Sequence, residues 1–264
     1  MSTALAPAPA FVATAPLDRI NPVARLLAAL LLAAVLVMSI DPVSAGVALL
    51  LEVPLVFASG LGWRGFWART WPVWLAAPFA GLTVALYGRA GGEVLVEWAL
   101  IRVSEGSLHL ALATVLRVLA IALPGVVLFA RVDPTDLADG LAQVLRLPSR
   151  FVLGALAAFR LFGVLRDDWR ALELARRARG IADRGRVRRF AGMAFALLVL
   201  SIRRGSTLAT AMEARGFGGD TPRTWARESR FGVGGWLLLA AATLVAAIAV
   251  TVAVVTGAWT FIVR

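Results

Sequence analysis

Two arginines stand in the same short setting, each between an alanine and a glycine. Ala178-Arg179-Gly180 closes the stretch ALELARRARG, and Ala214-Arg215-Gly216 closes ATAMEARG. A guanidinium offers five N–H donors in a rigid, permanently charged fork, which suits carboxylates or the carbonyl groups at a helix end. Two such arginines at two helix ends would fit a partner with two similar pockets. An ordinary helix ending is the alternative, since glycine closes helices and cations favour their C-termini.

Glu52 and Arg117 are charged residues near the middle of two long apolar stretches. Charges at that depth of a membrane are costly and usually paired or functional. We therefore hypothesise an intramembrane pair between Glu52 and Arg117. The alternative is that each side chain finds a separate partner or extends towards the membrane surface.

Several chemistries are excluded by residue types that are missing. The sequence has no cysteine and one histidine, His109, so it predicts no disulfide, thiol nucleophile or multi-histidine metal site. It has no lysine, so a Gly-x-x-x-x-Gly-Lys phosphate loop cannot form and the chain is not itself an ATPase. GLGWRG, residues 60–65, matches a dinucleotide-binding glycine pattern, but no strand–turn–helix unit surrounds it. We predict no catalytic residue, metal or cofactor.

The composition is that of an integral membrane protein. Hydrophobic residues make up 60% of the chain and charged residues 16%, with a mean hydropathy of +0.82. Soluble domains average about 45–50% apolar and about 25% charged residues. Apolar stretches near the length of about 20 residues that spans a membrane occupy 23–40, 43–60, 72–88, 107–130 and 232–257. We predict an all-α integral membrane protein with about five transmembrane helices.

The predicted spans divide the chain into four parts. Residues 1–16 form an Ala/Pro-rich tail that we expect to be disordered. Residues 17–130 hold transmembrane helices one to four, and residues 231–264 hold the last one. The part between them, residues 131–230, is polar and basic.

The positive charge of the chain is concentrated in that basic region. The net charge is +11, and residues 146–230 contain 18 arginines and 7 acidic residues. Because cytoplasmic loops of membrane proteins are enriched in arginine, we place 131–230 in the cytoplasm and the acidic loop 89–106 outside. A nucleic-acid partner is the alternative, but few aromatic residues are interleaved with the arginines, and we predict none.

Three amphipathic helices are expected in the basic region, over 134–146, 149–179 and 188–215. The second and third helices each have an apolar first half and an arginine-rich second half. The apolar half would lie at the membrane, and the arginine-rich half would extend into the cytoplasm. The apolar run 190–202 is shorter than a membrane span. Two further spans are the alternative, which would put arginines outside the cell against the charge rule.

Three stretches carry a family resemblance. SIRRGSTLATAMEARGFGG, residues 201–219, resembles the C-terminal signature of the transmembrane T component of energy-coupling factor (ECF) transporters. ALELARRARG is similar to the other arginine motif of that family, and LDRINPVARL, residues 17–26, to its N-terminal pattern. AAFRLFGVL, residues 157–165, departs from the family by lacking a proline after its arginine, which leaves the local helix geometry open.

The resemblance implies a subunit without catalytic activity in a vitamin or transition-metal importer of the cell membrane. Arg179 and Arg215 would each dock in one of two ATP-binding cassette ATPase subunits. Close approach would be allowed by the small neighbours Ala178, Gly180, Ala214 and Gly216. The membrane helices would hold a separate substrate-binding membrane subunit. The alternatives are a multi-pass membrane enzyme, which would need clustered catalytic side chains, and a membrane-anchored basic interaction protein.

Overall fold

The computed structural model describes residues 15–88, 91, 94–98, 101–180, 185–219 and 224–260. The chain forms two compact units, the first from residues 1–140 and 229–264 and the second from residues 141–228. The basic region expected at 131–230 overlaps the second unit but begins earlier. The tail expected at 1–16 lies almost entirely outside the described residues.

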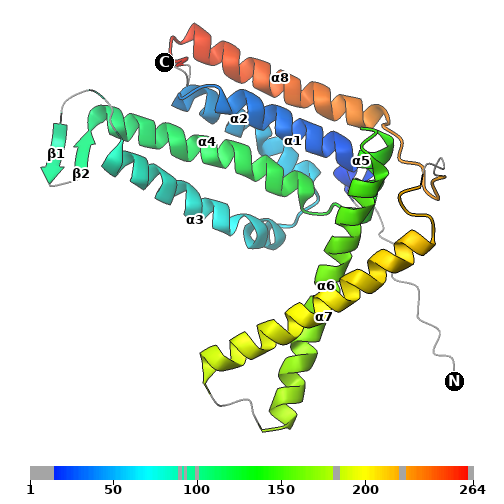
Figure 1. Ribbon diagram of the computed structural model, residues 1–264. Helices are drawn as coiled ribbons and strands as arrows, with labels where there is room; N and C mark the ends of the chain where they lie inside the picture. The colour runs from blue at the N-terminus through cyan, green and yellow to red at the C-terminus, as the bar shows by residue number, and fades with distance from the viewer. Residues whose placement is uncertain are drawn as a thin grey trace. The chain divides into compact units, whose positions relative to one another are not determined.

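The first unit is a bundle of five long helices (Figure 1). The short helix η1 (Pro16–Arg19) precedes α1, and α4 packs against α1, α2 and α3, while α8 packs against α1 and α2. The long helices are α1 (Pro22–Val37), α2 (Pro42–Ala58), α3 (Trp63–Tyr87), α4 (Glu105–Phe129) and α8 (Val233–Val255). These correspond to the five predicted spans and confirm the helical membrane-protein fold.

The first two helices begin at matching signals. Asn21 caps α1 by accepting a hydrogen bond from the Val23 N–H at 2.9 Å, and Asp41 caps α2 through the Ser44 N–H at 2.5 Å. Each cap is followed by a proline, whose fixed φ and missing N–H suit the first helical position. Asp41 therefore ends the short connection between α1 and α2, which lies where the predicted spans 23–40 and 43–60 adjoin.

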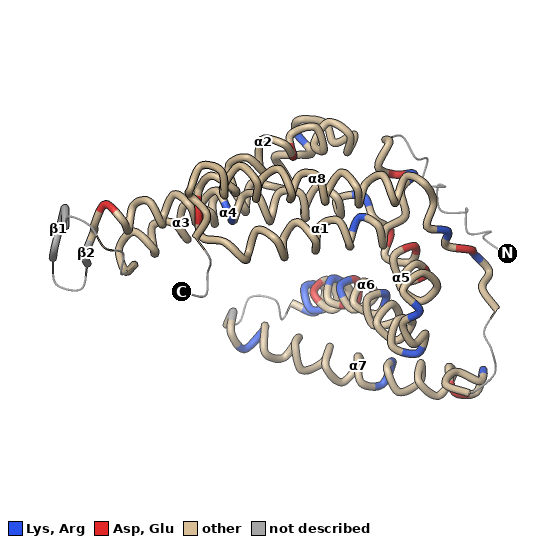
Figure 2. Tube along the Cα trace, turned by 90° about the horizontal axis from the view of Figure 1, so that it is seen from above, with Lys and Arg blue, Asp and Glu red and all other residues tan. Residues whose placement is uncertain are grey.

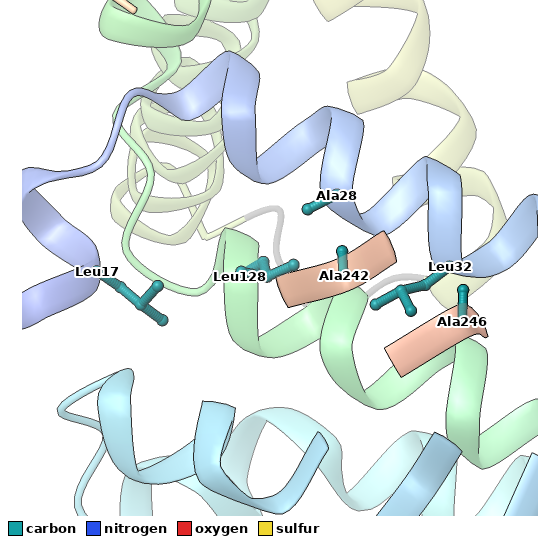
Figure 3. Close-up of a cluster of buried hydrophobic side chains, with 6 residues drawn as sticks. All are labelled: Leu17, Ala28, Leu32, Leu128, Ala242 and Ala246. Carbon is teal, nitrogen blue, oxygen red and sulfur yellow. The ribbon is translucent and has the colours of Figure 1, made fainter. Parts of the chain in front are cut away.

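Small residues let the helices approach closely. Ala242, Ala246, Ala249 and Ala253 recur every three or four residues on α8 and are all buried. Figure 3 shows Ala242 and Ala246 lying against Ala28 and Leu32 of α1 and Leu128 of α4, with Leu17 at the edge of the cluster. Close packing of this kind drives helix association in membranes. The hydrophobic effect cannot do so there, because the lipid tails are as apolar as the helix surfaces.

Two features around α3 differ from the sequence-based expectation. The tryptophan- and arginine-rich segment 63–71, which precedes the span predicted at 72–88, forms the first turns of α3. Its aromatic rings stack along one side of the helix, with Trp67 contacting Trp63, Phe66 and Trp74. After α3, β1 (Val94–Trp98) and β2 (Ile101–Ser104) pair as an antiparallel hairpin within the loop expected at 89–106.

The second unit consists mainly of two long helices. The shorter α5 (Pro134–Gln143) begins in the first unit and ends in the second, and α6 (Ser149–Ala178) and α7 (Arg186–Ala214) follow. These three helices match the predicted amphipathic helices to within a few residues at each end. Figure 2 shows charged residues recurring along α6, whereas they are sparse on the helices of the first unit.

Among the described residues, four helices are long and apolar enough to cross a membrane: α3, α4, α7 and α8. The helices α1 and α2 are apolar but shorter, with 16 and 17 residues. The sequence predicted α1 and α2 as spans and α7 as a cytoplasmic helix. Composition therefore does not by itself separate α7 from the spans.

Candidate functional site: two arginine-tipped helices

The α6 helix ends on Arg179. This residue is the C-cap, with φ −87° and ψ 5°, and the next residue, Gly180, has a φ of +66°. The Gly180 N–H donates to the Arg177 carbonyl at 3.0 Å, which closes the last turn. No neighbour lies within 4 Å of a Cβ added at Gly180, so its left-handed backbone, and not crowding, favours glycine here.

The α7 helix ends in the same way on Arg215. Arg215 is the C-cap, with φ −92° and ψ 12°, and Gly216 has a φ of +77°. The Gly216 N–H donates to the Glu213 carbonyl at 2.9 Å, and the Phe217 N–H donates to the Met212 carbonyl at 2.9 Å. These two bonds define a Schellman motif. Glycine therefore closes both helices, as the alternative of an ordinary helix ending expects, and the docking role of the two arginines stays a prediction.

Both arginine side chains are available to a partner. Arg179 and Arg215 are exposed, and neither has a hydrogen bond or ion pair with another residue in the described part of the chain. Ala178 and Ala214 are also exposed, and their short side chains leave the guanidinium groups uncovered. The two tips thus present the same chemistry in the same backbone setting.

Arg215 also borders a groove of about 490 Å³ between α6 and α7. Phe217, turned back by the Schellman motif, lines this groove together with Met212, and an apolar contact between these two positions commonly accompanies the motif. The α6 wall of the groove is formed by apolar side chains and one arginine, including Leu153, Leu156, Leu161 and Arg160. The Arg215 tip therefore combines a cation with an adjoining apolar surface.

Ion pairs join α6 and α7 where they cross. Arg204 on α7 makes two hydrogen bonds to the Asp168 carboxylate on α6, one of them at 3.1 Å. Closer to the α6 tip, the Glu173 carboxylate accepts a hydrogen bond from Arg189 of α7 at 2.6 Å. The order of these pairs shows that the two helices run in opposite senses, and Figure 1 shows them crossing at a wide angle. Arg179 and Arg215 therefore lie at opposite ends of the pair, and α7 alone is about 43 Å long at 1.5 Å per residue.

The Glu173 bridge predicts a pH dependence. The hydrogen bond from Arg177 and the positive charges of Arg177 and Arg189 hold the pKa of the Glu173 carboxyl below its ordinary value of 4.5. A group whose pKa is lowered by folding contributes its full stabilisation above the ordinary value and loses it as the pH falls through the lowered one. We expect the wild type to melt at a higher temperature than Glu173→Gln. The difference between the two melting temperatures should be constant above about pH 5 and should shrink as the pH is lowered towards 3. A margin that stays constant down to pH 3 would contradict the bridge.

Glu52 and Arg117 occupy neighbouring helices without a hydrogen bond between them. Glu52 is 7% exposed on α2, and both of its carboxylate oxygens lack a hydrogen-bond partner among the described residues. The Nε and Nη2 atoms of Arg117 on α4 also lack one there. The structure contains no hydrogen bond between Glu52 and Arg117, so their pairing stays a prediction.

The ion pairs that join α6 and α7 were not identified from the sequence. Asp168 and Arg204 are 36 residues apart, and many arginines compete for each acidic residue of this region. Both residues lie on predicted amphipathic helices, but the sequence does not say which charged side chains face each other. No group of three or more metal-ligating side chains occurs in the described ranges.

Comparison with known proteins gives a consistent result. Residues 13–225 match the profile of the CbiQ family, described as cobalt transport protein. The energy-coupling factor transporter transmembrane protein EcfT of Limosilactobacillus fermentum is 30% identical over 178 residues, which cover 62% of this chain and 65% of that relative. The chain thus spans just under two thirds of that relative's length.

Two further relatives align over more of the chain. EcfT of Bacillus selenitireducens is 28% identical over 241 residues, covering 87% of this chain and 90% of the relative. EcfT of Streptococcus equi subsp. equi is 26% identical over 221 residues, covering 79% and 81%. A family profile that matches most of the chain, together with these relatives, shows that the chain belongs to the CbiQ family, as a transmembrane (T) component of an energy-coupling factor transporter.

Proposed function

We propose that this chain couples ATP hydrolysis by two ATP-binding cassette ATPase subunits to the movement of a separate substrate-binding membrane subunit. The observation that carries the proposal is the pair of helix tips, each with an exposed arginine cap followed by a left-handed glycine. Two similar tips at the far ends of a crossed helix pair suit two similar docking pockets. The chain itself performs no catalysis in this scheme.

Arginine suits such a docking role physically. Its guanidinium keeps its charge under all conditions and binds carboxylates or several carbonyl groups through a planar fork. A charged hydrogen bond inside a protein interface is stronger than a neutral one. At Arg215, the adjoining apolar groove adds surface that a partner helix could bury. Arg179 and Arg215 would therefore be the principal contacts of the two ATPases.

Apolar surface on the second unit supports a partner within or at the membrane. Eight large apolar side chains of α6 and α7 are between 55% and 69% exposed, among them Phe159, Phe162, Phe195, Leu198 and Ile202. Exposed apolar patches of this extent mark interaction sites with proteins or lipid. We assign this surface to the substrate-binding membrane subunit, which would select a vitamin or a transition-metal ion.

We further propose that the basic region 131–230 lies in the cytoplasm. Its 18 arginines between 146 and 230 fit the charge bias of cytoplasmic segments. Although α7 is long and apolar enough to span, Arg204 near its centre is bound to Asp168. An ion pair at mid-membrane depth is costly, which favours a cytoplasmic or interfacial α7.

Cysteine labelling tests this orientation, since the chain has no cysteine of its own. Ser206 is exposed on α7, and Tyr87 is 63% exposed at the end of α3. In intact cells a membrane-impermeant maleimide should label Tyr87→Cys and leave Ser206→Cys unlabelled until the membrane is opened. Labelling of Ser206→Cys from outside intact cells would refute the orientation.

Reconstitution tests the proposed function as a whole. The chain should be purified together with the ATPase and substrate-binding subunits of its own organism and inserted into liposomes. We expect a complex with two ATPase subunits for each copy of this chain, and substrate uptake that requires ATP hydrolysis. A chain that forms no complex with ATPases, or uptake that continues without them, would refute the proposal.

A further inference from the structure

Glu52 is a buried acid of the first unit that the proposed coupling does not use. It is 7% exposed on α2, and neither carboxylate oxygen has a hydrogen-bond partner among the described residues. A charged carboxylate without a partner is very costly inside a membrane bundle, and such a group takes up a proton instead. The neutral carboxyl group then has one hydrogen to donate and needs an acceptor within reach.

The neighbouring helix α4 contains a carbonyl group that lacks its usual donor. Pro124 lies inside α4 and is buried. Because proline has no N–H, the carbonyl of Ala120, four residues earlier, does not receive its helical hydrogen bond from that position. Ala120 is 0% exposed, so solvent does not reach this carbonyl either. In membrane helices, carbonyls freed by proline are satisfied by neighbouring helices, polar side chains or internal water.

The packing of α2 against α4 brings Glu52 level with Pro124. Three neighbouring positions follow each other in the same order along both helices: Gly46 beside Leu116, Ala48 clustered with Ala120, and Leu55 packed against the cluster of Leu123 and Val127. The two helices therefore run in the same direction. Glu52 stands four residues after Ala48, on the same buried side of α2, as Pro124 stands four residues after Ala120.

The directions of the two groups also suit each other. Side chains on a helix lean towards its N-terminus, so the Glu52 carboxyl leans from the level of Pro124 back towards Ala120. Helix carbonyls point the other way, towards the C-terminus, so the Ala120 carbonyl points towards the level of Pro124. Arg117 lies seven residues before Pro124, which is about 10 Å along the helix axis.

We propose that Glu52 is a neutral carboxylic acid that donates a hydrogen bond to the Ala120 carbonyl left free by Pro124, and so holds α2 against α4. Either group alone would be buried without a partner, and each removes the cost of the other. Glu52 is accordingly a positioning residue of the membrane bundle. The inference does not depend on the docking roles of Arg179 and Arg215.

Two replacements of Glu52 separate its donor from its charge. Glu52→Gln keeps the size of the side chain and an N–H donor without a charge, so it should melt within about 1 °C of the wild type in detergent. Glu52→Leu cannot donate and leaves the Ala120 carbonyl without a partner. We expect it to lower the melting temperature by about 4 °C.

Replacing Pro124 tests which acceptor Glu52 serves. Pro124→Ala restores the backbone N–H, so the Ala120 carbonyl regains its helical donor. In this background Glu52→Leu should lower the melting temperature by less than half as much as it does beside proline. Pro78→Ala is the matched control, because Pro78 also lies inside a membrane helix but is exposed on α3. It should leave the effect of Glu52→Leu unchanged.

Infrared spectroscopy reports the proton directly, since a neutral carboxyl group absorbs apart from an ionised one. The difference between the wild type and Glu52→Gln at neutral pH should contain one neutral carboxyl band. The proposal is overturned if that band is missing, or if Glu52→Gln destabilises as much as Glu52→Leu, because Glu52 is then ionised, as a pair with Arg117 requires. It is equally overturned if Glu52→Leu has the same effect with proline and with alanine at position 124.

Discussion

Replacing Arg215 with glutamate is expected to release one ATPase subunit from the purified complex, and replacing both Arg179 and Arg215 should release both. Truncating one partner of a buried, hydrogen-bonded charge pair at an interface costs about 2–5 kcal/mol, which is a loss of affinity of about thirtyfold or more. Reversing the charge adds repulsion towards the acceptors that held the guanidinium. The measurement is the amount of ATPase that co-purifies with the tagged chain in mild detergent.

Arg203→Glu provides the matched control for this loss. Arg203 is exposed on the same helix as Arg215 and undergoes the same change of charge, but it lies within α7 and not at its tip. We expect Arg203→Glu to retain both ATPases at nearly the wild-type yield. Equal losses from Arg203→Glu and Arg215→Glu would show that overall charge, and not the helix tips, binds the ATPases.

The helix tips could be predicted from the sequence because their structure is local. Gly180 and Gly216 each follow the last residue of an amphipathic stretch, and a left-handed glycine closes a helix whatever surrounds it. The starts of α1 and α2 are also local features, because a capping residue and a proline are adjacent in the sequence at each start. Such features depend on a few neighbouring residues only.

Features that depend on distant residues could not be predicted in this way. Whether Glu52 meets Arg117 depends on how α2 and α4 are rotated about their axes, and the 64 residues between them do not reveal that rotation. The same holds for the hydrogen bond between Asn21 and Ser229, which are 208 positions apart. The resemblance of LDRINPVARL to a family pattern marked the segment but not its partners.

The first turns of α3 were missed for a different reason. Tryptophan and arginine at 62–71 are typical of a membrane interface, and that composition does not say whether the backbone is helical. The rings of Trp63, Trp67 and Trp74 recur at spacings of four and seven, which is a helical period. Reading this aromatic spacing, in addition to hydropathy, would have extended the helix to its observed start.

Replacing Gly216 with valine is expected to weaken ATPase binding at the α7 tip by about tenfold. A left-handed backbone costs an ordinary L-residue about 1–2 kcal/mol and a β-branched one more, so valine should abandon the φ of +77° found here. Both closing hydrogen bonds, from the N–H groups of Gly216 and Phe217, would be lost with it. Arg215 would then point in a new direction and Phe217 would leave the groove, although neither residue has changed. Co-purification and binding titration with the isolated ATPase measure the effect.

Two comparison variants separate backbone conformation from side-chain bulk. Asparagine is close to valine in size but tolerates the left-handed region, so Gly216→Asn should bind the ATPases almost as well as the wild type. Gly205→Val places the same side chain within α7, where a Cβ meets no atom within 4 Å and the backbone is not left-handed, and should also bind normally. Because Gly216 likewise has open space around it, a steric clash cannot account for a loss seen only with valine at this position. If Asn and Val at position 216 weaken binding equally, the left-handed turn is not what aims Arg215, and the tip must be held in place by the ATPase itself.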